Sequence, residues 1–286
     1  MSFNTMLKEK AKQNIINLQN VLFKKFPGGE LHITDDWIQD RTSCPIKVIA
    51  RIQSSDDLMK LMLFTNACKC TYGMIPDELV LPYIPYARQD RVANIGEALS
   101  IKVFSDILNS LNYSKVIVLD PHSDVSSALI NNIVIIPQWK IWGDYLNKQQ
   151  EEGAISNFDL ISPDAGALKK IYKLAEATMC KHIRVGTKHR DTITGKITGT
   201  SVDGQAKNKL AIIVDDICDG GRTFIEVAKV IKEQYDELML CVTHGIFSNG
   251  LSVLNEYYDI ITCTNSFIQG EFTQDSVHII PLETIL

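Results

Sequence analysis

Short apolar runs rich in Val and Ile alternate along the chain with longer segments of helix-like, amphipathic periodicity. Strands that are buried on both faces have this continuous apolar character, and they occur in parallel sheets that helices cover. The sequence therefore predicts an α/β fold, with mostly parallel sheets flanked by helices. The expected strands are 47–52, 78–84, 115–120, 133–136, 158–162, 209–216, 238–244 and 260–264, and the expected helices are 57–68, 99–111, 166–178 and 222–235.

Chain length and the repetition of this pattern favour two domains. The 286 residues exceed the roughly 100–200 residues of one typical domain. Both halves end apolar runs in polar residues, as in Leu119-Asp-Pro-His and Val214-Asp-Asp, so one α/β unit is used twice. We place the boundary within 137–143, where the strand pattern breaks, which gives an N-terminal domain 1–139 and a C-terminal domain 140–286.

Charge and composition exclude several classes of protein. A net charge of −5 argues against a protein whose main partner is nucleic acid or an anionic membrane. No apolar run approaches the ~20 residues of a membrane helix, and the first residues carry charges where a signal peptide is apolar. We therefore expect a cytoplasmic protein whose seven cysteines are reduced thiols.

The segment 212–224 combines an apolar strand, an acidic cluster, a glycine pair and a helix. Ligands of open α/β sheets bind at the carboxyl ends of strands, and a glycine-rich turn into a helix offers backbone N–H groups to a phosphate. Asp215 and Asp216 then accept hydrogen bonds from sugar hydroxyls or hold Mg²⁺ through water. The alternative is helix capping by acidic residues, which fits only Asp219.

Three further polar segments follow strands or lie between them. Arg88 and Gln89 stand beside aromatic residues, where arginine suits polyphosphate oxygens, although a solvated loop explains them as well. His122 and Asp164 each follow a strand and suit a metal-bound nucleotide, whereas a lone histidine is more often structural. Lys188 and Arg190 precede a Thr- and Gly-rich stretch, which is either a catalytic loop or an exposed hairpin.

Taken in order, the segments 85–91, 120–122, 162–166, 188–190, 214–216 and 243–248 resemble those of the ribose-phosphate pyrophosphokinases over nearly the whole chain. The resemblance implies two type I phosphoribosyltransferase-like domains. It also implies a Mg²⁺-dependent transfer of the β,γ-diphosphate of ATP to the anomeric hydroxyl of ribose 5-phosphate, which releases AMP and forms phosphoribosyl pyrophosphate.

The resemblance also implies roles for individual residues. The catalytic cations are Lys188 and Arg190, and the residues near Mg²⁺ are His122 and Asp164. The residues that contact ATP are Phe26, Glu30, Arg88, Gln89 and His122. The residues that bind the sugar phosphate are Asp215, Asp216, Asp219, Gly220, Gly221, Arg222 and Thr223. Phe26 and Glu30 match an adenine-binding hairpin that the family supplies from a neighbouring subunit, so a homo-oligomer, at least a dimer, is expected.

The phosphate loop departs from the family pattern. The family has Asp-Thr-Gly-Gly-Thr or a near variant, whereas this chain has Asp219-Gly-Gly-Arg-Thr. The missing side chain at Gly220 leaves room, and the fork of Arg222 can span two phosphates. The acceptor is then either ribose 5-phosphate, with Arg222 on the helix surface, or a larger molecule such as ADP-ribose, as in an ADP-ribose pyrophosphokinase of NAD metabolism.

Two competing classes remain. A phosphoribosyltransferase would use the same acidic loop but would not need a second domain with an Arg-Gln-Asp-Arg nucleotide site. A non-catalytic regulatory relative would be expected to lose the loop cations, yet Lys188 and Arg190 are both present.

Overall fold

The structure, a computed structural model, describes residues 15–34, 44–190, 197–267 and 277–286, without the side chains of 188–190 and 197–198. It divides into two compact units, Met1–Ile136 and Pro137–Leu286. Residue 139, where the sequence placed the boundary, lies inside helix α5 (Gln138–Glu151), for which Pro137 is the N-cap. The break in the strand pattern is therefore the start of a helix.

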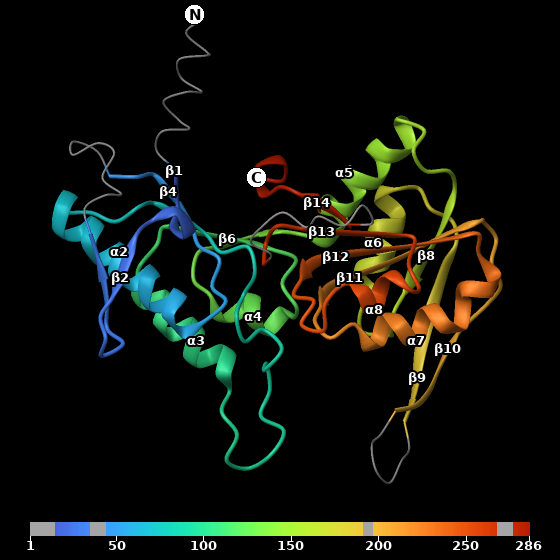
Figure 1. Ribbon diagram of the computed structural model, residues 1–286, viewed down its shortest axis with the longest axis horizontal. Coiled ribbons are helices and arrows are strands. Elements are labelled where there is room, and N and C mark those ends of the chain that lie inside the picture. Colours follow the sequence, from blue (N-terminus) through green and yellow to red (C-terminus); the bar gives the residue numbers. More distant parts are fainter. Residues whose placement is uncertain (1–14, 35–43, 191–196, 268–276) are drawn as a thin grey trace, which may run out of the picture. The chain divides into compact units, whose positions relative to one another are not determined.

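The first unit contains a five-stranded parallel sheet in the order β1-β4-β5-β6-β7 (Figure 1). Its strands are β1 (Ile15–Asn17), β4 (Lys47–Ile49), β5 (Glu78–Val80), β6 (Lys115–Leu119) and β7 (Ile133–Ile136). Its helices are α2 (Ser55–Tyr72), α3 (Ser100–Ser110) and α4 (Asp124–Leu129), and a 3₁₀ turn covers Leu18–Asn20. Val48, Leu79 and Val118 from the sheet are fully buried against Phe64 of α2 and Phe104 of α3.

The ends of α2 show why that segment is helical. The Ser54 hydroxyl accepts the N–H of Asp57 at the first turn, and Gly73 takes the left-handed conformation, φ 71°, that ends the helix. A separate antiparallel hairpin, β2 (Phe23–Lys25) and β3 (Leu31–Ile33), forms its own two-stranded sheet.

The second unit contains a seven-stranded sheet in the order β10-β9-β8-β11-β12-β13-β14. Only the β9–β10 pair among the described strands of this sheet is antiparallel. The strands are β8 (Phe158–Ser162), β9 (Ile183–Arg190), β10 (Ile197–Val202), β11 (Leu210–Cys218), β12 (Glu237–Gly245), β13 (Ile260–Thr264) and β14 (Val277–Ile280). The helices are α5, α6 (Leu168–Ala177), α7 (Arg222–Ile231) and α8 (Ser252–Asn255), with 3₁₀ turns at Lys232–Gln234 and Leu282–Thr284.

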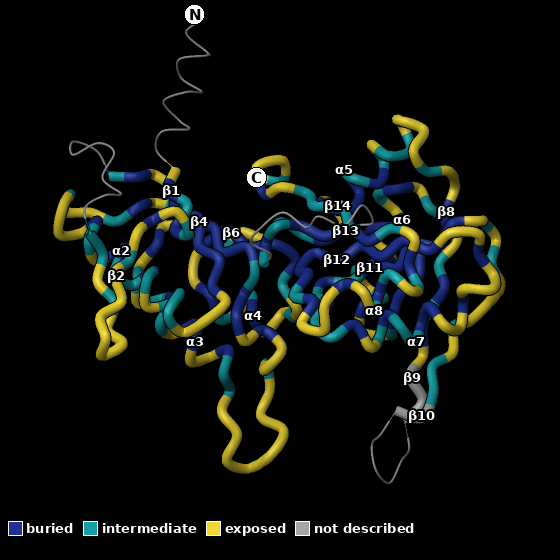
Figure 2. The backbone as a smooth tube through the Cα atoms, in the orientation of Figure 1, coloured by how far each residue is buried: buried dark blue, intermediate teal, exposed yellow. Residues whose placement is uncertain are grey.

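Helices cover both faces of this second sheet, with α5 and α6 on one side and α7 on the other (Figure 1). Ala211 and Ile213 of β11 pack with Phe224 and Val227 of α7 in one buried cluster. Figure 2 shows the central strands as continuously buried stretches, while the exposed residues gather in the loops. The α/β class and the mostly parallel sheets expected from the sequence are confirmed.

Several elements were not expected from the sequence, namely β1, α4, α5, α8 and β14. Three expected strands are shorter in the structure: β4 ends at Ile49, β5 at Val80 and β6 at Leu119. No described helix combines the length and the apolar character needed to cross a membrane.

Candidate active site

Two adjacent carboxylates lie near the carboxyl end of β11, beside the start of α7. Successive side chains of a strand point to opposite faces of the sheet. Asp215 continues the alternation of Ala211 and Ile213, which face α7, and Asp216 faces the side covered by α6. The pair expected from the sequence is therefore split between the two faces of the sheet.

Lys170 of α6 holds the second carboxylate. Its ammonium Nζ lies 3.2 Å from Oδ2 of Asp216, and the side chain of Asp216 is only 8% exposed. An ion pair so little exposed to water needs its partner, because removing the cation leaves a buried charge. Sequence reasoning missed this residue, because Lys170 is one of several lysines on a helix and meets Asp216 only through the fold.

Asp215 is in a different electrostatic situation. Burial raises its pKa well above the usual value for an aspartate, and the negative charges of Asp216 and Asp164 raise it further. One oxygen of Asp215 also accepts the backbone N–H of Asp216 at 2.9 Å. A carboxylate with these neighbours favours a ligand that brings hydroxyl donors or a cation.

Asp164 lies in the turn between β8 and α6. Its Oδ1 accepts the N–H groups of Gly166 at 3.0 Å and Ala167 at 3.3 Å, and the Ser162 hydroxyl donates to its backbone carbonyl at 2.7 Å. The carboxylate thus shapes the turn, and its charge is close enough to affect Asp215.

The carboxylates of this site suit a magnesium ion that takes most of its ligands from water and substrate. Among the described residues, no group of three or more His, Cys, Asp or Glu side chains is placed to hold a metal. Mg²⁺ commonly keeps several waters and is bound through one or two carboxylates together with substrate phosphates. Asp164 suits that arrangement. His122, the other expected metal contact, belongs to the first unit.

The glycine pair forms the start of α7. Gly221 is the N-cap, with φ +78°, and a Cβ on it would lie 3.0 Å from Cδ2 of Leu254. Both the backbone conformation and the close contact therefore require glycine. Asp219, which the capping interpretation favoured, is not the N-cap, because Gly221 takes that position. The N-cap residue itself therefore offers no side chain to the first backbone N–H groups of α7, as in a phosphate-binding helix start.

The side chains around this turn differ from the expectation at one position. Arg222 is exposed at the first residue of α7 and Thr223 is partly buried behind it. The space that the missing side chain of Gly220 was expected to leave is instead filled, because a Cβ there would lie 3.0 Å from Nδ2 of Asn249. Sequence reasoning missed Asn249, which follows the family-like segment 243–248.

For the expected loop cations, Lys188 and Arg190, the structure describes only the backbone. Lys188 and Arg190 lie in β9, where Lys188 is paired in register with Thr200 and Arg190 with Ile197 of β10. Their side chains lie outside the described residues, as does the Thr- and Gly-rich stretch 191–196. The β9–β10 pair is the hairpin that the sequence offered as the alternative to a catalytic loop.

In the first unit, two of the expected nucleotide-binding segments begin at neighbouring strand ends. The N–H of Leu119, at the end of β6, donates to the carbonyl of Pro82, just after β5, at 3.1 Å. The segment after β5 contains the exposed Arg88 and Gln89, and the segment after β6 contains the exposed His122. These three residues thus follow adjacent parallel strands at the same edge of their sheet.

The expected adenine hairpin is a real hairpin. Phe26 and Glu30 stand at the two sides of the turn between β2 and β3, where the N–H of Phe26 donates to the carbonyl of Glu30 at 2.8 Å. Gly29 provides the positive φ of 93° that the turn needs. The ring of Phe26 is 39% exposed, and the ammonium of Lys24 lies 4.9 Å from its centroid.

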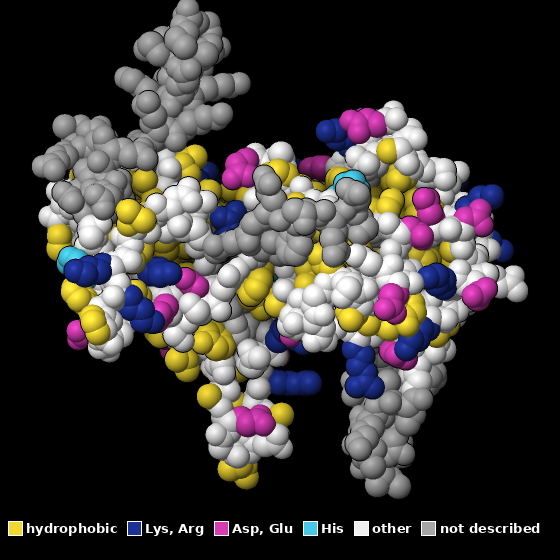
Figure 3. Space-filling model, viewed as in Figure 1, with side chains coloured by type: hydrophobic (Ala, Val, Ile, Leu, Met, Phe, Trp, Pro, Cys, Tyr) yellow, Lys and Arg dark blue, Asp and Glu magenta, His cyan; other side chains and the backbone are white. Residues whose placement is uncertain are grey.

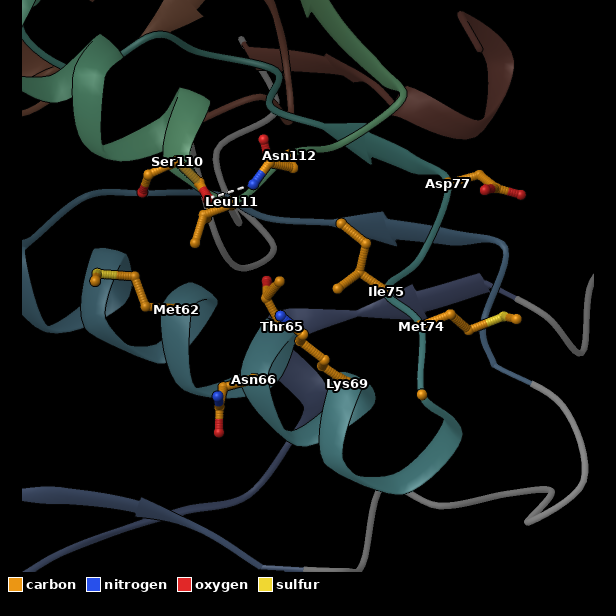
Figure 4. A pocket seen from close by; sticks show the side chains of 11 residues that line it. Met62, Thr65, Asn66, Lys69, Met74, Ile75, Asp77, Ser110, Leu111 and Asn112 are labelled. Carbon is orange, nitrogen blue, oxygen red and sulfur yellow. Dashed lines mark hydrogen bonds between the residues drawn. The ribbon is translucent and has the colours of Figure 1, made fainter.

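A cavity of about 650 Å³ lies elsewhere in the first unit (Figure 4). Side chains from α2, such as Thr65 and Lys69, and from the end of α3, such as Asn112, line it. Other lining residues lie in 73–77, just before β5. The cavity is therefore at the amino-terminal edge of the sheet, away from the strand ends that carry Arg88 and His122.

On the face shown in Figure 3, Lys and Arg side chains are scattered among Asp and Glu. Such a mixed surface has no resemblance to the basic stripe of a nucleic-acid-binding protein.

Comparison with known proteins shows similarity to one group of enzymes. The family model for the N-terminal domain of ribose phosphate pyrophosphokinase matches residues 2–111. A ribose-phosphate pyrophosphokinase of Pyrococcus furiosus is 29% identical, over 91% of this chain and 88% of its own length. Ribose-phosphate pyrophosphokinase 2 of Archaeoglobus fulgidus is 27% identical, over 76% of this chain and 72% of its own.

A solved structure shows the same fold. The phosphoribosylpyrophosphate synthetase of Mycobacterium smegmatis superposes with a TM-score of 0.78, covering 98% of this chain and 94% of that one, at 20% sequence identity. In sequence the chain is thus similar to ribose-phosphate pyrophosphokinases over most of its length, and in fold it is similar to a phosphoribosylpyrophosphate synthetase.

Proposed function

We propose that the protein is a diphosphokinase-type transferase that moves the β,γ-diphosphate of ATP to the anomeric hydroxyl of ribose 5-phosphate. The products are AMP and phosphoribosyl pyrophosphate. The observation that carries the proposal is the end of β11, where Asp215 and the Lys170-bound Asp216 precede the N-terminus of α7, whose N-cap is Gly221.

This arrangement suits the two ends of a sugar phosphate. Asp215 accepts hydrogen bonds from the sugar hydroxyls, with Asp216 paired to Lys170 beside it, while the backbone N–H groups from Gly221 onward bind the 5′-phosphate. The raised pKa of Asp215 favours this use, because hydroxyl donors stabilise its ionised form.

Phosphoryl transfer through a loose transition state depends on positioning and on charge neutralisation. Lys188 and Arg190 supply the cations, and Arg88, Gln89 and His122 contact ATP. Asp164 would hold Mg²⁺ together with waters and the nucleotide phosphates, and the ion would supply further charge neutralisation. Phe26 and Glu30 of the exposed hairpin serve the adenine site of a neighbouring subunit, so the active form is a homo-oligomer.

The test is direct. The purified protein is incubated with ATP, Mg²⁺ and ribose 5-phosphate, and AMP and the pyrophosphorylated sugar are measured by chromatography and ³¹P NMR. We expect both products in equal amounts. ATP hydrolysis to ADP, or no consumption of ATP with any ribose acceptor, contradicts the proposal and favours a non-catalytic relative.

A second candidate acceptor is ADP-ribose, whose terminal ribose also has a free anomeric hydroxyl. The observation that favours it is the exposed guanidinium of Arg222 at the first residue of α7, where it can reach a second phosphate. The same assay with ADP-ribose distinguishes the acceptors. AMP release with ribose 5-phosphate and none with ADP-ribose refutes the larger acceptor.

A further inference from the structure

The loop after β12 supports the phosphate turn from outside. The side-chain amide of Asn249 donates a hydrogen bond from Nδ2 to the carbonyl oxygen of Gly220 at 3.0 Å. The same nitrogen lies 3.0 Å from the place where a Cβ on residue 220 would stand. Asn249 and a side chain at position 220 therefore compete for one space.

The backbone fixes Asn249 in this position. The N–H of Ser248 donates to the carbonyl of Asp219 at 3.2 Å, and the N–H of Phe247 donates to the carbonyl of Cys218 at 3.0 Å. The ring of Phe247 is 7% exposed, within the core cluster that includes Phe224 of α7. The loop after β12 is thus joined to the end of β11 and to Asp219 directly before the contact made by Asn249.

The hydrogen bond determines which way one peptide unit faces. In a planar trans peptide, the carbonyl of one residue and the N–H of the next point in opposite directions. Asn249 binds the carbonyl of Gly220, so the N–H of Gly221 points away from Asn249. Because two consecutive glycines permit rotation of this peptide unit, an external hydrogen bond is needed to hold it.

We propose that Asn249 is a positioning residue of the acceptor site, which directs the N–H of Gly221 toward the phosphate of the acceptor. This inference rests on the proposed function, because it assigns the glycine turn to the acceptor phosphate. It also couples positions 220 and 249, because a side chain at position 220 would displace the Asn249 amide that orients the peptide unit between Gly220 and Gly221.

The expected effect is confined to the acceptor. Asn249→Ala removes the hydrogen bond but leaves the chain fold intact, because the side chain is exposed. We expect the KM for the acceptor to rise roughly three- to tenfold, which corresponds to the loss of one hydrogen bond. The kcat and the KM for ATP should stay unchanged. A rise in KM at constant kcat is the mark of lost binding that is equal in the ground and transition states.

Gln234→Ala is the matched control. Gln234 is also an exposed carboxamide, and its Nε2 donates to the backbone carbonyl of Val230 at 3.1 Å, at the opposite end of α7. It should leave both KM values unchanged. A fall in melting temperature shared by both variants, or an equal rise in the KM for ATP and for the acceptor, would assign Asn249 a structural role and overturn the proposal.

A double-mutant cycle tests the shared space. Gly220→Ala should raise the acceptor KM in the wild-type background, because its Cβ displaces Nδ2 of Asn249. In the Asn249→Gly background, the same substitution should add little. Additive effects of the two substitutions contradict the proposed competition.

Binding of inorganic phosphate, measured by calorimetry, separates this proposal from the proposed function. Weaker phosphate binding by Asn249→Ala than by the wild type and Gln234→Ala supports the positioning role, even if no ribose acceptor is turned over. Equal phosphate affinity in all three proteins, or no phosphate binding by the wild type, overturns it, whatever the activity.

Discussion

Replacing Lys170 with Met removes the cation that faces Asp216 while keeping the length of the side chain. The ammonium and Oδ2 are 3.2 Å apart, and the two side chains are 28% and 8% exposed. Exposed ion pairs contribute about 0–1 kcal/mol, whereas breaking a buried pair costs about 3–5 kcal/mol. This pair lies between the two cases, so we expect the free energy of unfolding to fall by about 2 kcal/mol.

The assay is thermal unfolding of the ligand-free protein, followed by circular dichroism. At roughly 2–4 °C per kcal/mol, Lys170→Met should lower the melting temperature by about 4–8 °C. Lys173→Met is the matched control, because Lys173 is exposed on the same helix. Exposed substitutions of this kind change stability by about 0.5 kcal/mol or less.

Lys170→Arg and Asp216→Asn complete the test. Arg keeps the charge and should recover most of the lost stability. In the double variant Lys170→Met with Asp216→Asn, the loss should be smaller than the sum of the two single losses, because no unpaired charge remains. A melting temperature of Lys170→Met equal to that of Lys173→Met would falsify the reasoning, since it shows that Asp216 does not depend on this cation.

Three further predictions concern the second unit. Lys188→Ala should lower the rate of AMP formation by about 100-fold or more without changing the melting temperature; unchanged turnover removes Lys188 from the mechanism. Asp215→Asn should stabilise the ligand-free protein at neutral pH. Because the pKa of Asp215 is raised by burial and by Asp216, its contribution to stability is present below the ordinary value of 3.8 and is lost as pH rises, so the variant's advantage should grow with pH. An advantage that shrinks as pH rises contradicts this sign. Tyr235→Phe should cost about 1–3 kcal/mol in urea unfolding, because its hydroxyl donates to the fully buried Asp159 at 2.8 Å and accepts from Arg184 at 3.0 Å; an unchanged midpoint shows that the network does not need this hydroxyl.

The parallel strands were predictable because burial on both faces leaves a continuous apolar run. Segments 133–136, 158–162 and 260–264 are strands with the expected bounds. The edge strand β14 was missed because it is partly polar. β9 and β10 were expected only as an exposed hairpin and not as strands of the main sheet, because Ile183–Arg190 carries cations and glycine where an internal strand is apolar.

The site was predictable only where its residues lie close together along the chain. The acidic pair lies near the end of one strand and the glycine turn follows it, so the pattern of strand, turn and helix predicts the position of both. Lys170 and Asn249 reach the same site from 46 and 29 residues away from their partners. Nothing local distinguishes either residue, so only the packed fold reveals them. The contact between Asn249 and Gly220 was missed for the same reason.

The contact between Gly221 and Leu254 restricts how relatives of this protein can diverge. A side chain at position 221 would require an unfavourable positive φ and would clash with the buried Leu254, so we expect glycine to be retained at this position. At position 220 the obstacle is one exposed amide, which a single second substitution removes. Changes at 220 and 249 should therefore appear together across related sequences, with a small residue at 249 wherever 220 has a side chain, and this covariation would trace how acceptor preference has evolved.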